Sequence, residues 1–165
     1  MEVDYTITAP CLDMTGRLDS TNDVQTYITA GNATITLRSK ISGKRYTYKI
    51  KAMENKDGTV AALPDRGYFV NLLTGPDNNG DFTYIGILTS QLNLRLTPKS
   101  RMHTESSPVQ AFRFLLTCLS KGGMPGSFEV WHAGKCGRCG RKLTVPESVA
   151  RGIGPDCAEM MGGGL

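Results

Sequence analysis

Residues 33–52 read ATITLRSKISGKRYTYKIKA, and this stretch determines the class of fold that we expect. In residues 33–38 and again in 45–52, apolar or aromatic side chains alternate with polar ones, which is the period of a half-buried β-strand. The intervening residues 39–44 contain a Ser-Gly pair that favours a turn. We therefore predict a hairpin with one apolar face and one cationic face, the latter carrying Arg38, Arg45, Lys49 and Lys51.

Further strands and one clear helix are expected downstream of the hairpin. Residues 68–73 and 82–89 are apolar on both alternating sets, which is typical of strands covered on both faces. Residues 92–96 and 127–131 alternate and predict two more strands. Ser107 as N-cap, Pro108 in the first helical position and apolar residues at helical spacing predict a helix over about 107–121. Residues 22–30 fit a short helix.

Together these elements predict an α+β fold with a mainly antiparallel sheet. One amphipathic helix packs on this body, and a small C-terminal module similar to a treble clef or zinc ribbon follows it. The expected units are an acidic N-terminal arm (1–30), the β-rich body with its helix (31–126) and the C-terminal module (127–165).

Composition excludes several classes of protein. The chain has 165 residues, 39% of them apolar, and no apolar run long enough for a membrane-spanning helix. Its first residues lack the basic start and apolar stretch of a secretory signal, so we expect neither a membrane protein nor a secreted one. Five cysteines, an odd number without an export signal, argue for reduced thiols or a metal site.

Three of the cysteines form a motif with metal-ligand spacing near the C-terminus. The order is His132-x3-Cys136-x2-Cys139-x17-Cys157. The tight pair with a glycine between its cysteines is typical of a zinc knuckle, and the GIGPDC turn at 152–157 would bring the third sulfur from a helix start. His132 is the natural fourth ligand, with Asp156, Glu159 or water as alternatives, and a redox-active pair is the competing interpretation.

The zinc in such a site is expected to be structural. Four protein ligands leave no open position for substrate, so we do not expect an enzyme. About 35 residues with few large apolar side chains need the metal for their folding energy. A catalytic zinc would lack one ligand and need a base nearby, for which Glu147 and Glu159 are the local candidates.

The segment from His132 to Cys157 closely resembles the C-terminal module of a family of bacteriophage and prophage proteins of unknown function, DUF6011. The resemblance is carried by HAGKCGRCGRKLTVPESVARGIGPDC, and three shorter segments between residues 30 and 78 are similar to the body of members of comparable length. It implies a phage-borne accessory protein with a zinc module that acts in the bacterial host cytoplasm. The family carries no established activity.

Charge is distributed unevenly and suggests a binding function. Residues 1–30 contain five acidic side chains and one basic, whereas residues 31–60 contain seven basic and two acidic. The cationic hairpin face, together with Arg138 and Arg141 in the zinc module, suits the phosphates of a nucleic acid. A protein-binding inhibitor of a host bacterial enzyme or defence system is the alternative, and a merely solvated basic face is the plainest reading.

Overall fold

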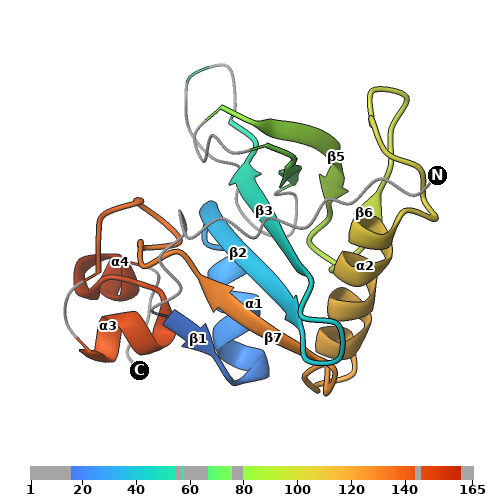
Figure 1. Ribbon diagram of the computed structural model, residues 1–165. Helices are drawn as coiled ribbons and strands as arrows, with labels where there is room; N and C mark the ends of the chain where they lie inside the picture. Colours follow the sequence, from blue (N-terminus) through green and yellow to red (C-terminus); the bar gives the residue numbers. More distant parts are fainter. Residues whose placement is uncertain (1–15, 55–56, 58–66, 76–79, 144–145, 161–165) are drawn as a thin grey trace.

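The computed structural model describes residues 16–54, 57, 67–75, 80–143 and 146–160. Within them a seven-stranded antiparallel sheet has the order β1-β7-β2-β3-β4-β5-β6 (Figure 1). Its strands are β1 (Gly16–Leu18), β2 (Asn32–Ser39), β3 (Arg45–Ala52), β4 (Tyr68–Leu73), β5 (Phe82–Leu88), β6 (Leu94–Arg95) and β7 (Phe128–His132). The helices are α1 (Thr21–Ile28), α2 (Ser107–Ser120), α3 (Pro146–Arg151) and α4 (Pro155–Met160). The predicted α+β class is confirmed.

Strands β2 and β3 form the predicted hairpin. They pair from Asn32 opposite Lys51 to Arg38 opposite Arg45. The Ser39 amide donates to the Lys44 carbonyl at 2.8 Å, and Gly43 takes the positive φ of 74° that this tight turn requires. The alternation in the sequence therefore predicted both the strands and the face on which each side chain lies.

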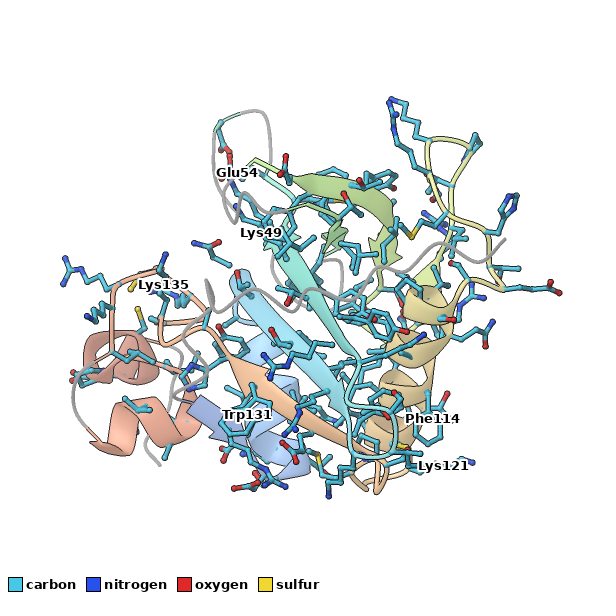
Figure 2. All side chains as sticks on the ribbon, in the orientation of Figure 1. Lys49, Glu54, Phe114, Lys121, Trp131 and Lys135 are labelled. Carbon is cyan, nitrogen blue, oxygen red and sulfur yellow. The ribbon has the colours of Figure 1, made fainter. Side chains whose placement is uncertain are left out.

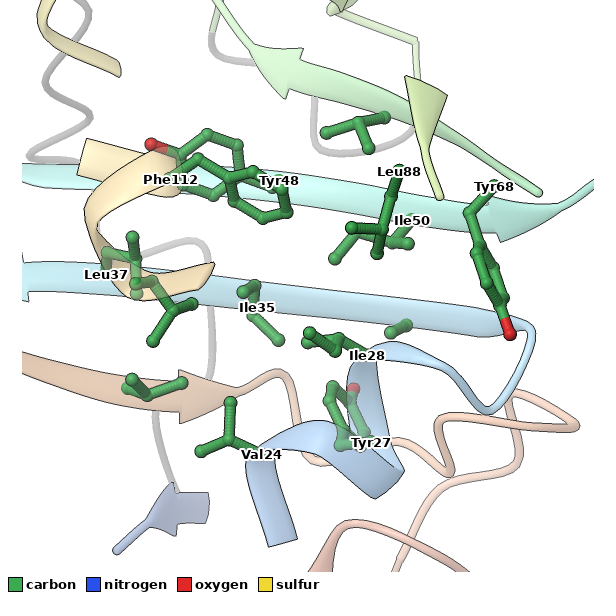
Figure 3. Close-up of a cluster of buried hydrophobic side chains, with 14 of the residues drawn as sticks. Val24, Tyr27, Ile28, Ile35, Leu37, Tyr48, Ile50, Tyr68, Leu88 and Phe112 are labelled. Atoms are coloured by element: carbon green, nitrogen blue, oxygen red, sulfur yellow. The ribbon is translucent and has the colours of Figure 1, made fainter. Parts of the chain in front are cut away.

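Helices α1 and α2 pack on the same face of the sheet, and the core lies between them and β2, β3 and β7 (Figure 3). The Tyr48 hydroxyl donates to the Pro108 carbonyl at 2.6 Å, and the Tyr48 ring lies 4.8 Å from that of Phe112. From α1, Val24, Tyr27 and Ile28 are buried against the strands. Full burial of each such side chain contributes about 1.5–3 kcal/mol, so this face is the main source of stability.

The start of α2 lies one residue earlier than its sequence suggests. Ser106, in an extended conformation, is the N-cap, so Ser107 is the first helical residue and Pro108 the second. A proline fits either position because the amides of the first turn have no partner within the helix. The predicted Asn22–Ala30 helix is present as α1, where the Ser20 side chain accepts a hydrogen bond from the Asp23 amide.

The side of the sheet opposite α1 and α2 is called the outer face here. Strands β4 and β5 were expected to be covered on both sides, but this expectation is wrong at Phe69 of β4, which lies on the outer face and is 43% exposed. The two longer described helices, α1 and α2, both lie on the inner face. Strand register places on it Glu129, Trp131, Thr36, Arg38, Arg45, Thr47, Lys49, Lys51, Phe69, Asn71 and Tyr84, of which Thr36 and Thr47 are buried.

Two differences concern the ends of the sheet. Strand β6 is only two residues long, and the strand predicted for residues 92–96 does not begin at Leu92, because Leu92 takes a left-handed φ of 61°. Strand β7, which begins the C-terminal segment, lies between β1 and β2 and so joins the cysteine motif to the body. No described helix is long and apolar enough to cross a membrane.

Candidate metal centre and the adjacent cleft

Cys136 and Cys139 lie in a tight loop that is closed by backbone hydrogen bonds. A bridge joins Lys135 to Lys142, and the Cys136 amide donates to the Arg141 carbonyl at 2.8 Å. The Gly140 amide donates back to the Cys136 carbonyl at 2.9 Å, with a φ of 80° at Gly140 that only glycine adopts without strain. This geometry is the knuckle predicted from the spacing of the pair.

The turn between α3 and α4 brings the third cysteine to this loop. The Gly137 amide donates to the Gly152 carbonyl at 2.9 Å, and Gly152 has a φ of 76°. Gly154 then donates its amide to the Cys136 sulfur at 3.3 Å. Cys157 follows in α4 and is buried, whereas Cys139 is exposed.

The three sulfur atoms are arranged as metal ligands. The Sγ atoms of Cys136, Cys139 and Cys157 all lie within 4.8 Å of one another. With Zn–S bonds of about 2.3 Å, tetrahedral geometry places sulfurs about 3.8 Å apart, which this cluster can reach with small side-chain rotations. Soft thiolates are the donors that suit zinc, iron and copper ions. The predicted cysteine cluster can therefore hold a metal ion.

Hydrogen bonds prepare one of these thiols for ligation. Burial raises the pKa of Cys136, but amides of Gly154 and Arg138, the latter 3.4 Å from the sulfur, together with contacts to Cys139, lower it to about 7. Burial raises the pKa of Cys157 above its usual value, although Arg138 Nη1 lies 3.7 Å from that sulfur. A bound cation would favour the thiolate form at all three positions.

His132 is not brought into this cluster. Its Nδ1 accepts a hydrogen bond from the Gly134 amide at 3.0 Å, and its Nε2 is bonded to the Val149 carbonyl of α3. Burial lowers the pKa of His132, outweighing the effect of that carbonyl, so the ring is neutral near pH 7. Of the other candidates for a fourth ligand, Glu159 lies outside the cluster, and the Asp156 side chain is outside the described part of the chain.

Tyr27 holds the segment with the three cysteines against the sheet, a role that sequence reasoning did not predict. Its hydroxyl donates to the carbonyls of Thr34 and Lys135 at 3.1 and 3.3 Å. Its ring lies so close to Gly137 and Gly152 that a Cβ at either glycine would come within 2.6 Å of it. The glycines at these two positions were a signal of close packing, but nothing in the sequence named the ring that packs there.

The six basic residues predicted to bind a partner fall into separate groups. Arg38 forms an ion pair with Glu129 at 3.6 Å, and Arg45 lies opposite Arg38 in the sheet. Lys49 and Lys51 lie at the other end of β3, where Lys49 and Glu54 are labelled in Figure 2. The knuckle carries the remaining two, the exposed Arg138 and Arg141.

A cleft joins the knuckle to the sheet and brings two of these groups together. Its volume is about 320 Å³, and the side chains that line it include Lys51 and Glu54 from the end of β3 and Arg138 and Cys139 from the knuckle. The cleft is also lined by Ala30, Gly31, Asn32 and Ala52. The Asn32 amide donates to the Gly137 carbonyl at 2.7 Å, which fixes the two walls of the cleft relative to each other.

Comparison with known proteins gives a match for the C-terminal part of the chain. Residues 130–162 match a family of unknown function, DUF6011, and the match covers most of β7, the three cysteines and the two short helices α3 and α4. Neither a curated protein nor a solved structure matches the chain. The segment with the cysteine cluster is thus similar to a recognised module, and its chemistry rests on the geometry described above.

Proposed function

We propose that this chain is a zinc-stabilised protein that binds nucleic acid and that its metal is structural. The donor set supports zinc, because three cysteine sulfurs within 4.8 Å of one another supply three of the four ligands that a structural zinc site requires. The C-terminal segment has short helices of six residues and a knuckle with little apolar surface of its own. A metal that links the knuckle to α4 supplies the folding energy that this segment lacks.

The cleft between Lys51 and Arg138 carries the nucleic-acid proposal. Two cations from different elements converge on one cleft, and Lys49 lies on the same face of β3. Phosphate groups are the common ligand of such converging bases, and a polyanion gains more from them than a single ion does. Glu54 lines the same cleft, and its negative charge would weaken the attraction of the two cations for a phosphate.

Titration of labelled DNA at two salt concentrations tests this proposal. We expect Lys49→Glu with Lys51→Glu to abolish binding at low salt, because each phosphate contact contributes to the salt dependence of affinity. The matched control is Lys40→Glu with Lys44→Glu, which makes the same change in charge at the exposed hairpin turn. Equal losses in the two double variants would show that only net charge matters and would overturn the assignment to this cleft.

The biological setting is proposed on the resemblance of the cysteine segment. We propose an accessory protein of a bacteriophage or prophage that acts in the bacterial cytoplasm. Support comes from the family likeness at residues 130–162 and from the cysteines, which are free thiols in the described residues. A reducing cytoplasm keeps such thiols available for a metal. Detection of the protein in the soluble fraction of infected or induced bacteria tests this setting.

A further inference from the structure

An aromatic pair, the exposed Phe69 and the half-buried Tyr84, lies on the outer face of β4 and β5. Phe69 is 43% exposed, and its ring lies 6.2 Å from that of Tyr84 at an interplanar angle of 68°. Full burial of a phenylalanine side chain is worth about 1.5–3 kcal/mol, so the exposed part of the Phe69 ring is apolar surface that a ligand could cover. The sequence had predicted that the two strands carrying these rings are covered on both faces.

Lysines from β3 interleave with this aromatic pair. Lys51 lies directly opposite Phe69 in the sheet, and Lys49 lies opposite Asn71, which in turn lies opposite Tyr84. Neighbouring strands are about 4.8 Å apart, so Tyr84, Asn71 and Lys49 span only about 10 Å. The Lys49 Nζ also lies 5.7 Å from the centre of the Phe82 ring, which confirms that cations and rings share this face.

The aromatic pair is continuous with the cleft at the knuckle. Lys51 belongs to both, because it faces Phe69 across the sheet and lines the cleft with Arg138. A ligand that lies along this path meets rings first, then an ammonium group, then a guanidinium group. Alternation of π-faces and cations is the pattern that suits a chain of bases joined by phosphates.

The same pattern argues against a duplex and against a protein interface. A duplex hides the faces of its bases in the stack and offers only phosphates and groove edges, so an exposed ring gains little from it. A protein interface of ordinary size needs a broad complementary surface with few charges at its centre. Phe69 is instead flanked by Lys51, and the other large apolar side chains exposed among the described residues, Ile41 and Phe114, lie on other elements.

We propose that the ligand of this face is single-stranded nucleic acid, with bases stacked on Phe69 and Tyr84 and phosphates held by Lys51 and Arg138. This inference rests on the proposed nucleic-acid function and specifies its substrate class. Single-stranded DNA and RNA share the chemistry that the rings and cations recognise. Comparing the affinities for a DNA strand and an RNA strand of the same length shows whether the face prefers one sugar.

The test measures fluorescence anisotropy of labelled oligodeoxythymidine, oligouridine and a DNA duplex of the same length. We expect either single strand to bind more tightly than the duplex. Phe69→Ala should weaken single-strand binding by about 5- to 150-fold, the worth of one stacked base, and leave the salt dependence unchanged. Phe69→Trp should restore the affinity because it restores a π-face.

Phe114→Ala is the matched control, since Phe114 is 45% exposed but lies on α2, away from β4 and β5 (Figure 2). It should leave binding unchanged, and thermal unfolding should show that both alanine variants remain folded. Equal affinity for duplex and single strands, with no effect of Phe69→Ala, would overturn this inference. The proposed function would still stand if the Lys49 and Lys51 double variant remained impaired, whereas absence of binding to all three probes would remove both.

Discussion

Replacing His132 distinguishes a structural histidine from a metal ligand. The ring is 1% exposed and occupies both of its nitrogens with backbone groups of Gly134 and Val149. Alanine leaves two buried polar groups unpaired, at about 1–3 kcal/mol each, so we expect the free energy of unfolding to fall by about 4 kcal/mol before the void is counted. A typical domain has only about 5–15 kcal/mol in total, so this loss is severe.

Replacing His132 with glutamine distinguishes a structural histidine from a metal ligand. Its side-chain amide can donate to the Val149 carbonyl, so His132→Gln should recover about 1–2 kcal/mol relative to alanine. Unfolding in urea followed by fluorescence of Trp131, the only tryptophan, gives the stabilities, and metal analysis gives the ion content. We expect one metal per chain in both variants. Loss of the metal from a folded His132→Gln protein would refute this reasoning, because a ligand would then have been removed.

The stability of the wild-type protein and that of His132→Gln should depend differently on pH. Burial lowers the pKa of His132 below its ordinary value of 6.5, so the folded state favours the neutral ring and the unfolded state takes up a proton first. The free energy of unfolding should therefore fall as the pH decreases below about 6.5 and level off below the folded pKa. Thiolate protonation weakens the metal site in both proteins, so the difference in slope between wild type and His132→Gln isolates the histidine. Parallel slopes would show that His132 does not titrate between the two states.

Two further predictions concern the metal module. Cys136→Ala should lose the ion and the cooperative folding of residues 130–160, because binding of a structural zinc, about 10–16 kcal/mol in small domains, is folding energy for such a segment. Metal analysis measures the ion content, and Trp fluorescence follows the unfolding. Cys118→Ala, which lies outside the cluster, should retain both the ion and the cooperative unfolding. Gly137→Ala should lower the free energy of unfolding by about 1–3 kcal/mol, because the new Cβ meets the Tyr27 ring at 2.6 Å, whereas Gly126→Ala meets nothing within 4 Å. A Gly137→Ala protein as stable as the Gly126→Ala protein would show that this packing is not tight.

The parts of the fold that follow from local patterns were predictable. The hairpin of β2 and β3, the helix α2 and the cysteine cluster each depend on spacings within about 25 residues, and each is present. The position of β7 between β1 and β2 was not predictable, because β1 is a three-residue strand, GRL, without a periodic signal. The exposure of Phe69 was not predictable either, since an apolar strand looks the same whether one or both of its faces are covered.

Strand β7 explains how the metal module and the outer face depend on each other. Its consecutive residues Trp131 and His132 point to opposite sides of the sheet, so one contributes to the outer face while the other packs beneath the knuckle. From the knuckle, Arg138 lies in the cleft with Lys51, and its amide donates to the Cys136 sulfur. A metal bound to that sulfur thus fixes the backbone that positions Arg138. A structural metal could then still determine whether the cleft has both of its cations, so the proposed binding face and the proposed metal site would act as one site rather than as two.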